Sequence, residues 1–175
     1  NLQLNIKQLR KPYEDEYNIA DYMPTSENNV EGMYQELLTY VMQIENKYLR
    51  QLAEYYFVKH DAFIKTFKEH SAAKSVHHSF AGGLLEHTLS ILRLCEYYAK
   101  AYPLLSKDLL YSAALFLFIW KTKELSTFPE NDYTDEGQLL GHIVIGVEMI
   151  SEAVRNIEGF PEKIANEVKH CVIAH

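Results

Sequence analysis

The sequence predicts an all-α helical bundle, because apolar residues recur with the 3.6-residue period of a helix across most of the chain. Its 175 residues are 47% hydrophobic, enough to bury one sizeable core. Only residues 1–25 differ: residues 2–7 alternate apolar and polar like a strand, and an acidic, tyrosine-rich segment follows. One strand cannot stand alone, so we expect residues 1–25 to be the end of a β domain plus a linker. Residues 26–175 then form the helical domain.

The helical period places the individual elements. It predicts helices over residues 26–52, 60–67, 84–98, 106–121, 138–155 and 161–175, with a loop over residues 126–136. Ser26 or Asn28 can cap the first helix and Ser106 or Asp108 the fourth, while Pro161 suits the first turn of the last. Asn1 is not an initiator residue and the chain ends inside a helical pattern. We therefore expect a fragment of a longer protein, with the helical domain incomplete at its C-terminal end.

The composition limits the classes of partner that the chain can bind. A net charge of −7 argues against a broad phosphate-binding surface, so nucleic-acid contact would have to be local or come from another domain. The longest apolar run, residues 109–120, is too short to cross a bilayer, and no signal-peptide pattern begins the chain, so we expect no membrane partner. Cys95 and Cys171 are isolated and predict reduced, buried thiols in a cytoplasmic protein.

Histidines are the residues best suited to chemistry here, because imidazole is a common ligand of transition metals. Six of the eight stand on or beside predicted helices: His77, His78, His87, His142, His170 and His175. Any one of them is more often a surface or hydrogen-bonded core residue. His87 follows two glycines, and His142 lies in an apolar stretch where its ring needs a partner. His170 and His175 are about 140° apart around one helix, so only one can point squarely at a given site.

Several segments resemble one family in the same order along the chain. They are AAKSVHHSFAGGLLEHT at 72–88, NDYTDEGQLLGH at 131–142, Phe160-Pro161-Glu162 and Lys169-His170. Together they resemble the YhaM-type 3′-5′ exoribonucleases, which are HD-domain metal-dependent phosphohydrolases, and the likeness covers nearly all of residues 26–175. The opening strand resembles the end of the OB-fold RNA-binding domain that precedes the HD domain in this family.

The resemblance implies a divalent metal, Mn²⁺ above others, which activates water to attack a phosphodiester at the 3′ end of single-stranded RNA or DNA. The metal ligands that it implies are His87, His142, and His170 or His175. The residues that it implies for the substrate are Lys121, as the catalytic cation facing the phosphate, and Lys74, His77 and His78 in substrate binding.

One departure from the family pattern is severe. Where the family has His-Asp-Ile-Gly-Lys, this chain has Leu117-Phe118-Ile119-Trp120-Lys121. Leu117 and Phe118 thus occupy two lost ligand positions, and neither can bind a cation, so metal affinity should fall steeply. Trp120 in place of glycine adds a large side chain, which typically costs about 1–3 kcal/mol unless its surroundings adapt. The plainer interpretation is that Leu117, Phe118 and Trp120 simply pack in the core.

We therefore expect a protein of exoribonuclease or phosphodiesterase lineage whose hydrolysis is absent or strongly impaired, a pseudoenzyme. The first alternative is a non-catalytic module of the same fold that binds a nucleotide or a protein. The second is an active phosphohydrolase that recruits other ligands: His77, His78 and Asp135 with His87 and His142. The third is a scaffold that forms homo-oligomers through its tyrosine-rich helices.

Two weaker patterns concern the surface. Lys65, Lys68 and Lys74 could form a phosphate-binding edge, although a solvated helix face is the commoner arrangement. Tyr55-Tyr56-Phe57, Tyr97-Tyr98 and Tyr133 could stack on bases, although tyrosines at helical spacing more often lie in a core or an interface.

Overall fold

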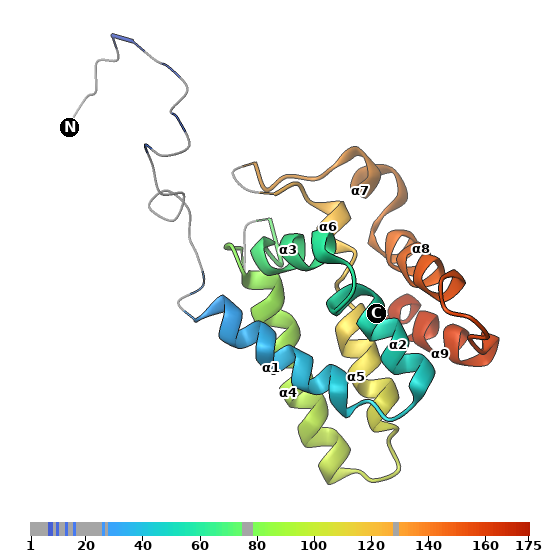
Figure 1. The fold of residues 1–175 in the computed structure, drawn as a ribbon. Helices are drawn as coiled ribbons and strands as arrows, with labels where there is room; N and C mark the ends of the chain where they lie inside the picture. Colours follow the sequence, from blue (N-terminus) through green and yellow to red (C-terminus); the bar gives the residue numbers. More distant parts are fainter. Residues whose placement is uncertain are drawn as a thin grey trace.

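The computed structural model describes residues 7, 8, 10, 13, 16, 26, 28–74, 79–127 and 130–175. Helices dominate this part of the chain, so the all-α prediction is confirmed there (Figure 1). Outside the helices, Leu125 and Tyr133 form an isolated antiparallel bridge. The predicted strand at residues 2–7 lies almost wholly outside the described residues, and so do His77 and His78.

The helices follow one another with short connections. They are α1 Val30–Gln43, α2 Lys47–Phe57, α3 Asp61–Glu69, α4 Gly83–Ala101, α5 Lys107–Phe116, α6 Lys121–Glu124, α7 Asp135–Leu140, α8 His142–Arg155 and α9 Glu162–Ile173. Helix α4 packs on α5 and on α1, and α8 packs on α9 (Figure 1). Fully buried aromatic and aliphatic side chains fill the space between these helices, among them Leu37, Leu52, Phe57, Phe67, Leu85, Leu92, Tyr111 and Phe116.

The predicted helix over residues 26–52 is wrong in extent, because two helices occupy it. Helix α1 begins after Asn29, whose side chain caps it, instead of Ser26 or Asn28. The chain is extended at Ile44 and restarts at Asn46, whose side chain accepts the N–H groups of the next helix. Asp108 holds this break by accepting the N–H groups of Glu45 and Asn46 at 3.1 and 2.7 Å. Asp108 is therefore not a cap of α5, which Ser106 provides.

The predicted helix over residues 138–155 is also divided. Gly141 adopts a φ of +74°, in the region that favours glycine, and it separates α7 from α8. Helix α7 begins earlier than predicted, at Asp135, after the capping side chain of Thr134. Pro161 stands at the N-cap of α9 instead of inside its first turn, and α9 ends at Ile173.

Two compositional expectations can be compared with the fold. Among the described residues, no helix is both long and apolar enough to cross a membrane. Cys95 and Cys171 are free thiols, but they are half-buried instead of buried as predicted.

Candidate functional site

The segment that replaces the family doublet is a turn held by its own backbone. Helix α5, predicted to continue to Lys121, ends at Phe116, and residues 117–120 form turns before α6. The N–H groups of Lys121 and Lys123 donate to the carbonyls of Phe118 and Trp120, each three residues back, at 3.0 and 2.9 Å. The indole N–H of Trp120 donates to the carbonyl of Leu117 at 2.6 Å. The turn therefore uses the one polar group that its side chains carry.

Two of the candidate histidines meet at Phe118. The ring centroids of His87 and Phe118 are 4.7 Å apart, and those of Phe118 and His175 are 5.2 Å apart, both edge-on. His87 reaches this position from the beginning of α4, which the chain enters through Gly82 at a φ of +86°. A Cβ atom on Gly82 would lie 3.2 Å from the side chain of Val30, so a glycine is needed there for space as well as for its backbone angle.

The third candidate histidine lies at Trp120. The centroids of the Trp120 and His142 rings are 4.6 Å apart. Trp120 is almost fully buried, and Gly146 on α8 provides its space, because a Cβ atom there would lie 3.2 Å from the indole. The surroundings therefore accommodate the bulky indole, and Trp120 belongs to the core, as the plainer interpretation expects. Leu117 and Phe118 are only half-buried, at the edge of that core.

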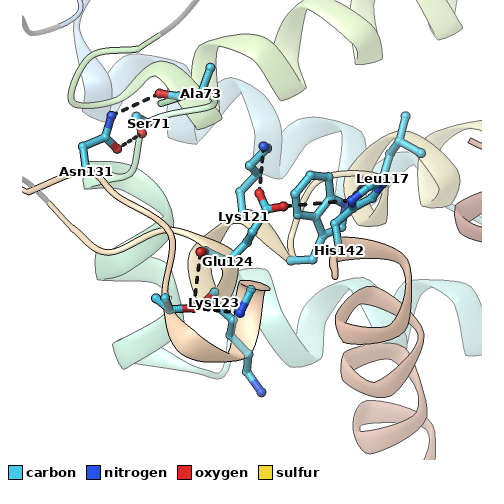
Figure 2. Close-up of polar contacts among 11 residues, drawn as sticks. Ser71, Ala73, Leu117, Lys121, Lys123, Glu124, Asn131 and His142 are labelled. Atoms are coloured by element: carbon cyan, nitrogen blue, oxygen red, sulfur yellow. Dashed lines mark hydrogen bonds and ion pairs between the residues drawn. The ribbon is translucent and has the colours of Figure 1, made fainter. Parts of the chain in front are cut away.

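A buried carboxylate completes the cluster. Glu124 is only 6% exposed, and its two oxygens face different partners: Lys121 Nζ at 2.9 Å and His142 Nδ1 at 3.9 Å (Figure 2). The Lys121 ammonium also lies 4.3 Å from the centre of the Trp120 ring. Its charge is thus neutralised within the cluster. The sequence prediction missed Glu124, although its spacing of three residues from Lys121 within a helix would have suggested the pair.

His70 is a second residue that the sequence prediction did not single out. It is 1% exposed at the end of α3, and neither of its ring nitrogens has a partner within hydrogen-bond distance and angle among the described residues. The Lys121 backbone lies close enough to favour the protonated ring slightly, but burial dominates and lowers the pKa of His70 to about 4. A neutral imidazole therefore packs beneath the Lys121 turn.

The remaining candidates lie away from the aromatic cluster. His170 is exposed on α9, in a surface hollow that it lines with Glu162 and Glu167. Of the two histidines in this part of the chain, His175 is therefore the one beside Phe118. Asp135 is exposed at the start of α7.

The surface lysines are largely paired with carboxylates. Lys74 bonds to Asp132 at 2.6 Å and lies over the Tyr133 ring. Lys68 pairs with Glu31, and Lys65 is exposed. The lysines thus resemble a solvated face more than a free phosphate-binding edge.

A metal does not fit the residues at the aromatic cluster. Phe118 offers no donor atom, and the only polar atom of Trp120 donates to a carbonyl. In the part of the chain that the structure describes, no three His, Cys, Asp or Glu side chains gather as a metal-binding group.

Comparison with known proteins gives the lineage. The chain is 32% identical over 174 residues to the 3′-5′ exoribonuclease YhaM of Bacillus subtilis (strain 168), and 32% identical over 175 residues to that of Geobacillus sp. (strain WCH70). Both alignments cover 99% of this chain. The chain is a YhaM-type sequence. This YhaM-type chain spans about half the length of these relatives, 54% and 53%. No family model and no solved structure matches it.

Proposed function

We propose that residues 26–175 form an HD-type domain of the exoribonuclease lineage that contacts the 3′ ends of single-stranded RNA, and that hydrolysis is absent or strongly impaired in this chain. The lineage rests on the two relatives named as 3′-5′ exoribonucleases. The OB-like origin of residues 1–25, a preference for Mn²⁺ and a cytoplasmic location belong to the same proposal and rest on the family resemblance and the composition.

The contact of Phe118 with both His87 and His175 is the observation on which the proposed loss of hydrolysis rests. By position, Phe118 stands where the family has a carboxylate, and its ring packs against two of the histidines that the resemblance implies as ligands. A phenyl ring supplies neither a donor atom nor negative charge, and a cation brought into apolar surroundings without compensation costs far more than it gains. An ion at Phe118 would therefore lack the carboxylate that the family supplies at this position.

Lys121 is also poorly placed to bind a substrate phosphate. Its ammonium pairs with the nearly buried Glu124, so binding a substrate phosphate would require it to leave that carboxylate. Such an exchange gives up a hydrogen-bonded ion pair that is only partly exposed to water. We therefore assign Lys121 first to holding α6 and Trp120 in place, and only second to substrate contact.

Binding without turnover is the second candidate function. The half-buried rings of Phe118 and His142 lie at the edge of the core, and base–aromatic stacking contributes about 1–3 kcal/mol per base. An RNA of the lineage could thus be held by stacking while its phosphodiester stays intact.

An exonuclease assay tests the proposal. Single-stranded RNA labelled at its 5′ end is incubated with Mn²⁺ and wild-type protein, or with Leu117→His/Phe118→Asp, which restores the family doublet. We expect no shortening by the wild type and stepwise shortening from the 3′ end by the restored variant. The matched control adds His87→Gln to the restored variant and should abolish the gain. Metal-dependent shortening by the wild type as fast as by the restored variant, and lost in His87→Gln, would refute the proposal.

A further inference from the structure

Helix α4 carries two apolar stripes on opposite sides. The inner stripe packs into the core: Leu84, Leu85, Leu89 and Leu92. The outer stripe is exposed: Leu94, Tyr97, Tyr98, Ala101 and, at the C-cap, Tyr102. Since each residue turns a helix by about 100°, the outer stripe lies roughly opposite the inner one. The C-terminal half of helix α4 therefore presents an apolar face to solvent.

The outer stripe has the form of a helix-packing surface. Leu94 is 52% and Tyr97 is 65% exposed. Ring centroids of Tyr97 and Tyr98 are 5.7 Å apart, and those of Tyr98 and Tyr102 are 6.1 Å apart, so the aromatic rings form a continuous ridge. Apolar residues at spacings of three and four form the ridges that pack into the grooves of another helix. A ridge of this kind is unusual on a face that only meets water.

The local charge around this face suits a second copy of this chain. Residues 94–105 contain one acid and one base, Glu96 and Lys100, which bond to each other at 2.7 Å. Beside them, Arg93 makes two hydrogen bonds to Glu36, at 2.8 and 2.7 Å. The stretch is thus neutral, whereas the whole chain carries −7. Two copies of this chain repel each other over most of their surface and can approach without like charges here.

We propose that the outer stripe of α4 is the contact of a two-fold dimer, in which it packs against α4 of a second copy. In a two-fold contact the same patch serves both copies, and a neutral, aromatic ridge is complementary to itself. Large aromatic side chains at the centre of such a contact supply most of its binding energy. Leu94 and Tyr97 are the central residues.

The chain mass measured by light scattering after size exclusion tests this proposal. At tens of micromolar we expect twice the 20.4 kDa of one chain for the wild type. Leu94→Glu/Tyr97→Glu should be monomeric, with dimer affinity weakened by about 30-fold or more, the loss typical of a central aromatic. Leu139→Glu/Val144→Glu places equal charge on another exposed apolar pair, on α7 and α8, and should stay dimeric. Circular dichroism confirms that both variants are folded.

The effect of ionic strength on the dimer is a second test. Added salt should strengthen the wild-type dimer, because it screens the repulsion between two chains of −7. A wild type that is monomeric at every concentration would refute the proposal, and so would a dimer unaffected by Leu94→Glu/Tyr97→Glu. If the monomer instead bound single-stranded RNA through this ridge, the same double variant would lose that RNA and the dimer would be overturned in favour of base stacking.

Discussion

Protonation of the buried His70 should weaken the fold in mild acid. Its pKa is lowered from 6.5 to about 4 because burial disfavours the charged ring. In the unfolded chain the same ring takes a proton near pH 6.5, so between these values the unfolded state binds more protons and stability falls as the pH falls. One pH unit corresponds to roughly 1.4 kcal/mol for one proton, so the loss is about 2 kcal/mol by about pH 5 and about 3 kcal/mol by about pH 4.

Urea unfolding across this pH range measures the effect. With an m-value of roughly 2 kcal/mol/M, the contribution of His70 lowers the wild-type midpoint by about 1 M between neutral pH and about pH 5. His70→Leu removes the titrating ring and should lose that part of the pH dependence, whereas His170→Gln, exposed on α9, should keep it. Ion-paired carboxylates, such as Glu36 with its lowered pKa beside Arg93, are present in all three proteins and cancel. Parallel curves for wild type and His70→Leu would refute the reasoning.

Two further predictions concern a close backbone contact beside Glu124 and the N-cap of α2. Gly137→Ala puts a Cβ atom 2.5 Å from the backbone oxygen of Glu124, which should cost about 1–3 kcal/mol and lower the melting temperature. Gly32→Ala, with nothing nearer than 3.6 Å in α1, is the control and should stabilise by about 0.5–1 kcal/mol; equal effects of the two would contradict the geometry. Asn46→Ala removes the acceptor for two N–H groups of α2 and should cost about 1 kcal/mol in urea unfolding, while an unchanged midpoint would show that the cap contributes nothing.

The helices could be predicted because their period is local, whereas their breaks depend on distant partners. The apolar spacing through residues 30–52 continues across Asn46, so the pattern does not reveal the break that Asp108 stabilises from 62 residues away. Gly141 could have been recognised as a break, since a glycine between two helical runs often adopts a positive φ.

Which candidate histidines lie near one another depends on the fold, and their role as ligands stays a prediction. The resemblance named His87, His142, and His170 or His175, and the structure places His87, His142 and His175 against Phe118 or Trp120. Sequence spacing could not separate His170 from His175, because the choice depends on how α9 lies on α8. The pairing of Glu124 with both Lys121 and His142 needed the turn at residues 117–120, which the continuous apolar run concealed.

The metal content of the purified protein tests the central claim most directly. Wild type and Leu117→His/Phe118→Asp are loaded with Mn²⁺, dialysed exhaustively and analysed by mass spectrometry, with circular dichroism to confirm folding. We predict a folded, metal-free wild type, because Leu117 and Phe118 withhold two ligands, and retained metal in the restored variant. A wild type that keeps about one equivalent of metal and loses it in His87→Gln would show that the histidines still form a site, and would contradict the account.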